Sequence, residues 1–407
     1  MKPEVFLPLA GIRVIEFSYL VMGPVCGMIL ADFGAEVIKV ESVSGDNTRR
    51  LTGAAAGFFG SFNRNKKSFA VDMDDKRGRE AVLRLLAGAD VLVENFGPKR
   101  MKKMGLTKEL LSRINPRLIT ASHQSFLPGP YANRHALDEV VQMMAGLAYV
   151  DKENGHSHYA GSNVNDIMSG LFGALGVLAA LTQRQRTGQG HAVQTGLFEN
   201  NVFLVLQHMM QAAISGQKTA EQPDPTTVWA VYDVFVSSDG EQVFLGAIND
   251  EQWFLLCQTF DFDDLSADLR LKSNQARVRA RSWLIPILRE RFATYSTQEL
   301  EQRFEQMGLP FARVGRPEDL FEDTHLKQTG GLVPMILPED GSHIGRPIQT
   351  QTALMPLSMD GQRLSVRDNP PHLGQHTISL LKELGYSESE IQTLISDNVI
   401  RASSVHR

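Results

Sequence analysis

Cysteine is scarce in this chain, and no pattern of metal ligands accompanies it. Cys26 and Cys257 are the only cysteines among the 407 residues, and each lies in an apolar stretch. Such usage excludes a disulfide framework and fits buried thiols in a reducing compartment. Because His, Cys, Asp and Glu do not recur at the spacing of known metal sites, no metal ion is predicted.

An excess of positive charge is also absent. Lys and Arg number 41 against 46 Asp and Glu, and the formal net charge is −5. Proteins that bind nucleic acid or anionic membranes need positive charge on some face, so neither partner is predicted. Residues 1–8 carry an acid and two prolines in place of an apolar signal segment. Export is therefore not expected, and a cytoplasmic location is predicted.

The chain also lacks a long hydrophobic run. The longest, 167–181, has about 15 residues, fewer than the roughly 20 that cross a bilayer. Its small residues and Ser169 predict a core helix packed on all sides. Asp166 directly precedes this run. Because Asp is a preferred N-cap residue, its carboxylate is interpreted either as a helix cap or as a nucleophile that the same N–H groups hold ionised.

Strand and helix patterns alternate in the first third of the chain. Strands are predicted at 12–17, 36–41, 68–73, 90–94 and 117–122, and helices at 25–33, 75–86 and 108–114. This alternation predicts an α/β fold with a parallel, doubly wound, Rossmann-like sheet. No Gly-x-Gly-x-x-Gly follows Phe17, so a dinucleotide cofactor is not predicted.

The length of the chain predicts two domains. Residues 213–225 are polar and rich in turn formers, which is typical of a linker. The following segment opens with a β-hairpin pattern and continues with helices, so 226–324 is predicted to form a smaller α/β domain. The larger domain is then discontinuous, comprising 1–212 and 325–407.

Eight short segments together resemble the class III CoA-transferase family, which includes formyl-CoA transferase and carnitine CoA-transferase. They are LAGIRVIEF (9–17), GAEVIKVE (34–41), GDNTR (45–49), NRNKKS (63–68), VENFGP (93–98), NPRLI (115–119), TGQG (187–190) and GQHT (374–377). Each is weak alone, but their common order and spacing extend the resemblance over nearly the whole chain.

The resemblance implies an enzyme that moves CoA from an acyl-CoA to a free carboxylic acid. In the family an aspartate attacks the thioester and forms a mixed anhydride, and CoA then returns to form an aspartyl thioester. Asp166 matches this nucleophile. CoA and acyl-CoA are substrates, and no covalently bound cofactor is expected. The implied assembly is an interlocked homodimer, with each active site between the large domain of one chain and the small domain of its partner.

Further site residues are carried over from the resemblance. Asp138 falls where the family has an acid close to the nucleophile, and it either orients Asp166 or caps its own helix. The CoA-binding positions match Val71, Asp72, Met73, Asn95, Phe96, Gly97, Lys103 and His135. Core packing explains Val71, Met73 and Phe96 equally well, and a basic run such as the one around Lys103 is usually a solvated face.

The chain departs from the formyl-CoA branch at several positions. His135 replaces a lysine, Ser42 an arginine and Val21 a glutamine, and a glycine-rich loop is missing at 245–250. The identity of the substrates therefore does not follow from the resemblance. Dicarboxylic acids such as succinate are favoured because many family members use them.

Three rival functions remain. A 2-methylacyl-CoA racemase, the main alternative, needs a histidine directly before the acid equivalent to Asp138, where this chain has Leu137 and places His135 two residues earlier. A non-catalytic acyl-CoA-binding protein would not need the Asp166 carboxylate. A nicotinamide-dependent dehydrogenase is disfavoured by the missing glycine motif.

Overall fold

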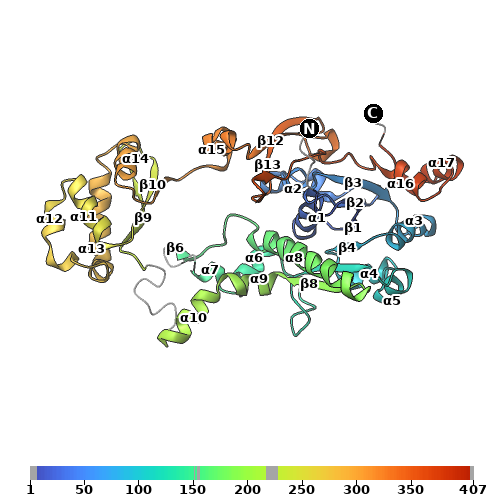
Figure 1. The fold of residues 1–407 in the computed structure, drawn as a ribbon, viewed down its shortest axis with the longest axis horizontal. Helices are drawn as coiled ribbons and strands as arrows, with labels where there is room; N and C mark the ends of the chain where they lie inside the picture. The colour runs from blue at the N-terminus through green and yellow to red at the C-terminus, as the bar shows by residue number, and fades with distance from the viewer. Residues whose placement is uncertain (1–6, 151, 154–155, 217–227, 404–407) are drawn as a thin grey trace. The chain divides into compact units, whose positions relative to one another are not determined.

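The computed structural model describes residues 7–150, 152–153, 156–216 and 228–403. It divides the chain into two compact units. One comprises Met1–Met210 and Lys327–Arg407, and the other Gln211–Leu326. The larger unit contains the sheet on which the candidate site is built (Figure 1).

The larger unit is built on a seven-stranded sheet in the order β16-β3-β2-β1-β4-β5-β8. Its strands are β1 (Arg13–Phe17), β2 (Glu36–Glu41), β3 (Lys66–Val71), β4 (Val91–Glu94), β5 (Ile119–Gln124), β8 (Ala192–Gly196) and β16 (Ile400–Arg401). Neighbouring strands run parallel except β16, which pairs antiparallel with β3. The predicted doubly wound α/β fold is therefore confirmed, with β1 at the point where the strand order reverses.

The helices of the larger unit and its boundaries are α1 (Met22–Asp32), α2 (Phe58–Phe62), α3 (Lys76–Ala87), α4 (Gly97–Lys103), α5 (Lys108–Ile114), α6 (Asp138–Met144), α7 (Leu147–Val150), α8 (Val164–Thr187), α9 (Leu197–Leu204), α10 (Leu206–Ser215), α15 (Thr324–Gln328), α16 (Thr377–Glu383) and α17 (Glu388–Ser396), of which α10 and α15 cross the boundaries between the units. Both faces of the sheet are covered by helices from this set. Short antiparallel pairs join β6 (Lys152–Glu153) to β7 (His156–Ser157), β12 (Leu332–Leu337) to β13 (Ile348–Ala353), and β14 (Ser358–Met359) to β15 (Gln362–Arg363).

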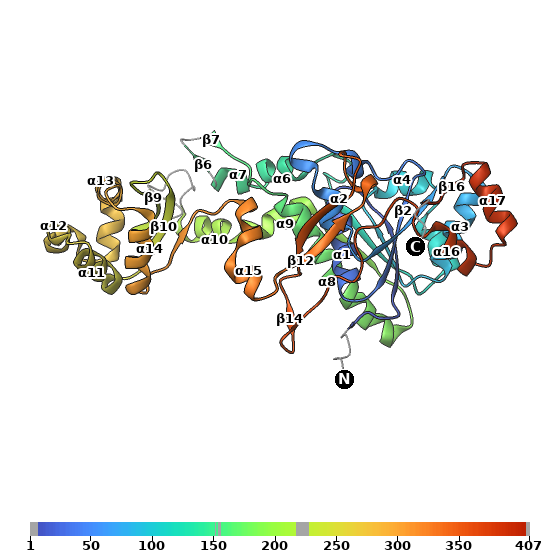
Figure 2. The same ribbon diagram turned by 90° about the horizontal axis from the view of Figure 1, so that it is seen from above.

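Two hydrophobic cores lie on opposite faces of the sheet. Val14 belongs to the core beneath α1 and α8, whereas its neighbour Ile15 belongs to the core with α3, α5, α16 and α17. Successive strand residues point to opposite faces, and both faces of this sheet are covered. Both views place α16 and α17 beside α3 (Figures 1 and 2). The apolar runs in the sequence follow from this double burial.

The smaller unit is a three-stranded antiparallel sheet packed against helices. The sheet order is β11-β10-β9, and the elements are β9 (Val231–Val236), β10 (Gln242–Ala247), α11 (Asp250–Thr259), α12 (Asp263–Ala267), α13 (Asn274–Phe292), α14 (Thr297–Gln306) and β11 (Phe311–Arg313). Its core contains the edge-to-face aromatic pair Phe235 and Phe292, at 4.9 Å between ring centroids.

The helix α8 is longer than predicted, and it is not packed on all sides. Among the described residues it is the one helix long and apolar enough to cross a membrane, a weak criterion that core helices of soluble proteins also meet. Its glycines face the fold: a Cβ at Gly170 would lie 2.8 Å from the Met22 carbonyl oxygen. Ile167, Leu171 and Leu175 on another face are 40, 47 and 51% exposed. The prediction of complete burial is wrong because only one stripe of α8 meets the sheet and α1.

Charged side chains on and near the neighbouring strands β1, β2 and β3 are buried together. Arg49 donates two hydrogen bonds of 2.8 Å to Glu41, and both side chains are 1% exposed. Nearby, the Lys66 ammonium lies 2.8 Å from Glu16, and the Lys39 ammonium lies 2.9 Å from Asp46. These pairs come from four segments of the resemblance, 9–17, 34–41, 45–49 and 63–68, which therefore meet inside the larger unit.

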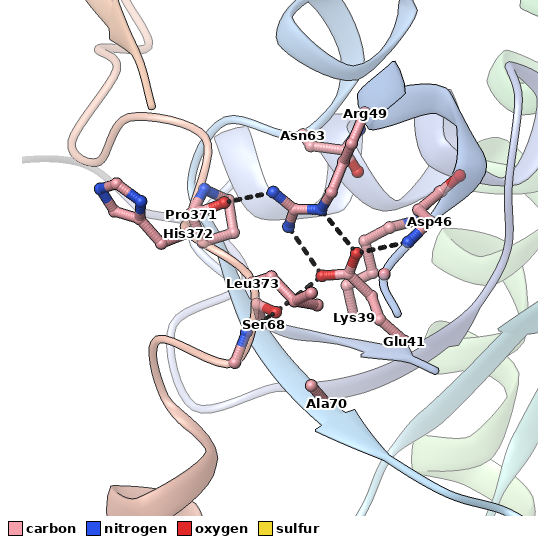
Figure 3. Close-up of polar contacts among 12 residues, drawn as sticks. Lys39, Glu41, Asp46, Arg49, Asn63, Ser68, Ala70, Pro371, His372 and Leu373 are labelled. Carbon is pink, nitrogen blue, oxygen red and sulfur yellow. Dashed lines mark hydrogen bonds and ion pairs between the residues drawn. The ribbon is translucent and has the colours of Figure 1, made fainter. Parts of the chain in front are cut away.

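The C-terminal segment joins the same network (Figure 3). Arg49 also donates to the Pro371 carbonyl at 3.1 Å. The Ser68 hydroxyl donates to Glu41 at 2.6 Å and accepts the Gly374 N–H at 2.8 Å. A buried charge is tolerated only where its hydrogen bonds are made, so these contacts fix residues 371–374 against β3.

Candidate active site

A cavity of about 420 Å³ opens at the carboxyl ends of three parallel strands. Residues 19–22 follow β1, 95–99 follow β4 and 124–126 follow β5, and all of them line it together with Asp166 and residues 132–137. Ligands of doubly wound sheets bind at this end of the strands, where the strand order reverses. The cavity is therefore the candidate active site.

Asp166 lies inside the first turn of α8, where it is the third residue of the helix, counting Val164 as the first. The N-cap is Asn163, and it makes no side-chain cap. The prediction that Asp166 is an N-cap residue is therefore wrong. The position still favours a negative charge, because the first N–H groups of a helix have no partner within it and carry the positive end of its dipole.

Asp138 holds the backbone of Asp166. The Asp138 side chain accepts the Asp166 N–H at 2.9 Å, the Asn165 side-chain amide at 3.0 Å and the Gln142 side-chain amide at 2.6 Å. Asp138 is 1% exposed. It does not cap its own helix, because the N-cap of α6 is Leu137. These hydrogen bonds support the interpretation that Asp138 orients Asp166.

The protonation of Asp166 is sensitive to this environment. Burial raises the pKa of its carboxyl to about 7, and the negative charges of Asp138 and Glu139 contribute to the rise. A carboxyl group that ionises near neutral pH inside a cavity is typical of a functional site. Near pH 7 the group is thus divided between an acid and a carboxylate.

The raised pKa of Asp166 predicts a cost in stability. The unfolded chain loses this proton near pH 3.8 and the folded chain near pH 7, so stability should fall as pH rises between those values and stay low above them. Asp166→Asn removes the cost, and we expect its Tm at pH 8 to exceed that of the wild type by a few degrees. Calorimetry at pH 4 should show the two proteins nearly equal. A lower Tm for the variant at both pH values would contradict the expectation.

The loop after β4 borders the cavity through Asn95, Phe96 and Gly97, whose contact with CoA stays a prediction. Glu94 shapes this turn, since its Oε2 accepts the N–H groups of Phe96 and Gly97, both at 2.9 Å. The Phe96 ring lies 5.4 Å from the Tyr19 ring, and the Arg100 guanidinium lies 4.1 Å from the Phe96 centroid. Phe96 is thus half-buried between core and cavity. His135 lines the same cavity.

The other predicted CoA residues do not border this cavity. Val71 is a core residue of β3, and Met73 packs against the same core. Asp72 accepts the Asp74 N–H at 2.9 Å, and Lys103 is exposed at the end of α4. Their role in CoA binding stays a prediction.

Several cavity residues were missed by the sequence analysis. The cations Lys99 and Arg134 line the cavity, as does His123. His123 is fully buried, its Nδ1 lies 3.0 Å from the Thr195 hydroxyl, and burial lowers its pKa to about 4, so the ring is neutral. The signal that could have identified His123 was its place among polar residues at the end of a buried strand. Arg134 directly precedes His135, which was predicted to bind CoA, but no sequence pattern marked Arg134 itself.

No metal centre is evident in the part of the chain that the structure describes, since no three His, Cys, Asp or Glu side chains are arranged to hold an ion. The charged groups that line the cavity include the Asp166 carboxyl and the cations Lys99 and Arg134.

Comparison with known proteins identifies relatives over nearly the whole chain. A family model described as CoA-transferase family III matches residues 9–377. The succinyl-CoA:glutarate CoA-transferase of Mus musculus is 33% identical over 97% of this chain and 90% of its own length. The succinyl-CoA–L-malate CoA-transferase beta subunit of Chloroflexus aurantiacus is 31% identical over 97% of this chain and 98% of its own.

The fold has a solved counterpart as well. A CAIB/BAIF family protein from Brucella suis superimposes with a TM-score of 0.82 and 31% identity, over 93% of this chain and 99% of the other. The sheet and the cavity therefore belong to an architecture that has been determined experimentally in a similar protein.

Proposed function

The chain belongs to CoA-transferase family III, and from that premise we propose that it moves CoA between acids through a covalent intermediate on Asp166. The observation that carries the proposal is the placement of Asp166. Its carboxyl lies in the cavity, largely buried, while Asp138 fixes its backbone. Burial keeps water away from the carboxylate and makes it more basic, and both effects favour attack on an acyl carbon.

In the first half of the reaction, an Asp166 oxygen attacks the thioester carbonyl carbon of the donor. The carbon–sulfur bond breaks, CoA leaves as a thiolate, and a mixed anhydride remains. The thiolate then attacks the aspartyl carbonyl of the anhydride, which releases the donor acid and leaves an aspartyl thioester. The acceptor carboxylate repeats these steps in reverse, so that acyl-CoA of the acceptor departs and the Asp166 carboxylate is regenerated.

Each attack places negative charge on a carbonyl oxygen. In the first turn of α1, Met22 and Gly23 carry N–H groups without a partner in the helix, whereas Pro24 has no N–H, and Met22 lines the cavity. Donors fixed in this way can stabilise the oxygen as its charge develops. They supply the oxyanion site of the proposed mechanism.

We favour dicarboxylic acids as the exchanged substrates. The names of two relatives contain succinyl-CoA paired with glutarate or malate. In this chain Lys99 and Arg134 line the cavity that contains Asp166. Positive charges there suit the phosphates of CoA and the second carboxylate of such an acid.

We also propose a homodimer, which the family resemblance describes as interlocked. Ile167, Leu171 and Leu175 form an exposed apolar stripe on α8, and Phe203 and Met209 on the following helices are 62 and 53% exposed. Exposed apolar surface of this extent is typical of a protein interface. A cytoplasmic location stays a prediction from the two buried free thiols.

The test is a screen of carboxylic acids with succinyl-CoA and acetyl-CoA, read by mass spectrometry of the CoA thioesters. Hydroxylamine added during turnover should convert Asp166 into a hydroxamate, located by peptide mass. Transfer without any trapped intermediate, together with an active Asp166→Ala variant, would refute the mechanism. Rapid deuterium exchange at the α-carbon of a 2-methylacyl-CoA without CoA transfer would favour the racemase instead.

The mechanism predicts a dependence of rate on pH. Only the ionised Asp166 can attack, so kcat/KM should rise with pH through a midpoint set by its pKa of about 7. Glu139→Gln removes one of the charges that raise this pKa, and we expect the midpoint to move to lower pH. Asp138→Asn should move it further while also lowering kcat. Glu80→Gln on α3, at the other face of the sheet, is the control, and an equal shift there would contradict the assignment.

A further inference from the structure

The side chain of Asn95 bridges two loops that border the cavity. Its Oδ1 accepts the Tyr19 N–H at 3.1 Å, and its Nδ2 donates to the Tyr19 carbonyl at 2.7 Å. The parallel pairing of β1 with β4 ends at Phe17 and Glu94. The Asn95 side-chain amide therefore continues the hydrogen-bond pattern between β1 and β4 beyond the ends of the two strands. Each polar atom of this side chain thus makes one hydrogen bond to the backbone of Tyr19.

The backbone immediately after Tyr19 needs such support. Leu20 has a φ of 61°, in the left-handed region that residues other than glycine adopt rarely. The next residue, Val21, is the N-cap of α1 and makes no side-chain cap. A turn of this kind keeps its shape only where surrounding contacts determine it.

Hydrogen bonds of Ser18, the residue before Tyr19, also support this turn. The Ser18 carbonyl accepts a hydrogen bond from Lys39 at 2.7 Å, and the Ser18 hydroxyl donates to Glu16 at 2.7 Å. The buried charges therefore hold Ser18 from the inside of the fold. Asn95 holds Tyr19 from the side of the cavity.

The supported turn determines where α1 begins beside Asp166. Leu20, Val21 and Met22 line the cavity with Asp166. Gly170, one helical turn beyond Asp166, packs so closely that an added Cβ would lie 2.8 Å from the Met22 carbonyl oxygen. The first turn of α1 and the second turn of α8 are thus neighbours, and a change in the turn at Leu20 would move the N–H groups of α1.

We infer that Asn95 is a positioning residue for CoA transfer, acting through the turn at Leu20 rather than through a side-chain contact with CoA. Its bridge holds the first-turn N–H groups of α1 at the cavity, next to the carboxyl group that attacks. The inference rests on the proposed function, because it assigns to those N–H groups the stabilisation of the developing oxyanion.

The test separates kcat from KM. Misplacement of catalytic groups by about 1 Å can cost on the order of 10²-fold in rate, so Asn95→Ala should lower kcat by roughly 10- to 100-fold. The KM for the acyl-CoA donor should stay within about threefold, because no side-chain contact with it is lost. Asn115→Ala is the matched control, since the Asn115 side chain also both donates to and accepts from the backbone: it donates to the carbonyls of Leu86 and Ala89 at 3.1 and 2.7 Å and accepts the Arg117 N–H at 3.1 Å. Its kcat should match that of the wild type.

A second measurement needs no substrate. Amide hydrogen exchange of the peptide spanning residues 18–25 should be faster in Asn95→Ala than in wild type, and unchanged in Asn115→Ala. Normal exchange in Asn95→Ala would overturn the inference even if no acid in the screen were accepted. A raised KM with unchanged kcat would also overturn it and show that the side chain binds CoA. An equal loss of kcat in both variants would show a general effect of stability.

Discussion

Asp166→Asn is expected to lower the rate of CoA transfer by at least about 10³-fold, because an amide cannot form the anhydride and loss of a nucleophile removes the covalent route. The variant keeps the size of the side chain, and the hydrogen bond from its backbone N–H to Asp138 does not involve the substituted group. The fold should therefore survive. The same variant is expected to be more stable than wild type at pH 8, so loss of activity would coincide with a gain in Tm.

A control variant is needed for the general effect of removing a negative charge from the first turn of a helix. Asp263 lies in the first turn of α12, is exposed, and belongs to the smaller unit. Asp263→Asn should transfer CoA at the wild-type rate. Initial rates with a donor and acceptor found in the screen would measure both variants, and binding of the donor by calorimetry would show that Asp166→Asn still takes up acyl-CoA. Retention of more than a tenth of the wild-type rate by Asp166→Asn would contradict its role as nucleophile.

Arg49→Met is expected to destabilise the protein by about 3 to 5 kcal/mol, the effect of removing one partner from a buried ion pair. It would leave the Glu41 carboxylate buried without its cation and the Pro371 carbonyl without its donor. Because this network holds residues 371–374, the C-terminal segment should loosen first. Urea unfolding followed by circular dichroism measures the loss, and hydrogen exchange of the 371–377 peptide shows where it begins.

Two further variants separate the buried pair from ion pairs in general. Arg77→Met breaks an exposed pair with Asp397, whose side chains are 45 and 46% exposed. It should cost less than about 1 kcal/mol. The double variant Arg49→Met with Glu41→Gln removes the unpaired charge and should recover part of the stability lost by Arg49→Met alone. If Arg49→Met were as stable as Arg77→Met, the network would not hold the C-terminal segment.

The nature of the fold was predictable because burial leaves a strong pattern. Strands covered on both faces carry apolar residues on both sides, as Val14 and Ile15 do in 12–17 and Val37 and Ile38 in 36–41. The helices between the strands show the helical period of apolar residues. The position of Asp166 at the beginning of a long apolar run was visible for the same reason. Its chemical role came from the family resemblance, which is carried by short segments in order.

Local sequence patterns did not predict the sites where charged or polar groups are buried together. Arg49 and Glu41 look like surface residues in the sequence, yet both are buried because each satisfies the other. Asn95 was predicted to bind CoA from its place in a motif, whereas its side chain bonds to Tyr19, 76 residues earlier. Asp166 was interpreted as an N-cap, whereas α8 begins two residues before it. Helix ends and polar partners depend on contacts that local spacing does not report.

The sequence by itself determined the α/β fold, the family and the identity of the acid that we propose as nucleophile, because hydrophobic period and short motifs are local properties. Only the tertiary structure decided that Asp138 holds Asp166, that burial raises the pKa of Asp166 to about 7, that Asn95 supports the turn at Leu20, and that Val71 and Lys103 lie outside the cavity. The physical reason is that electrostatic and hydrogen-bond energies depend on distance and burial in space. Both are set by the packing of segments far apart in the chain.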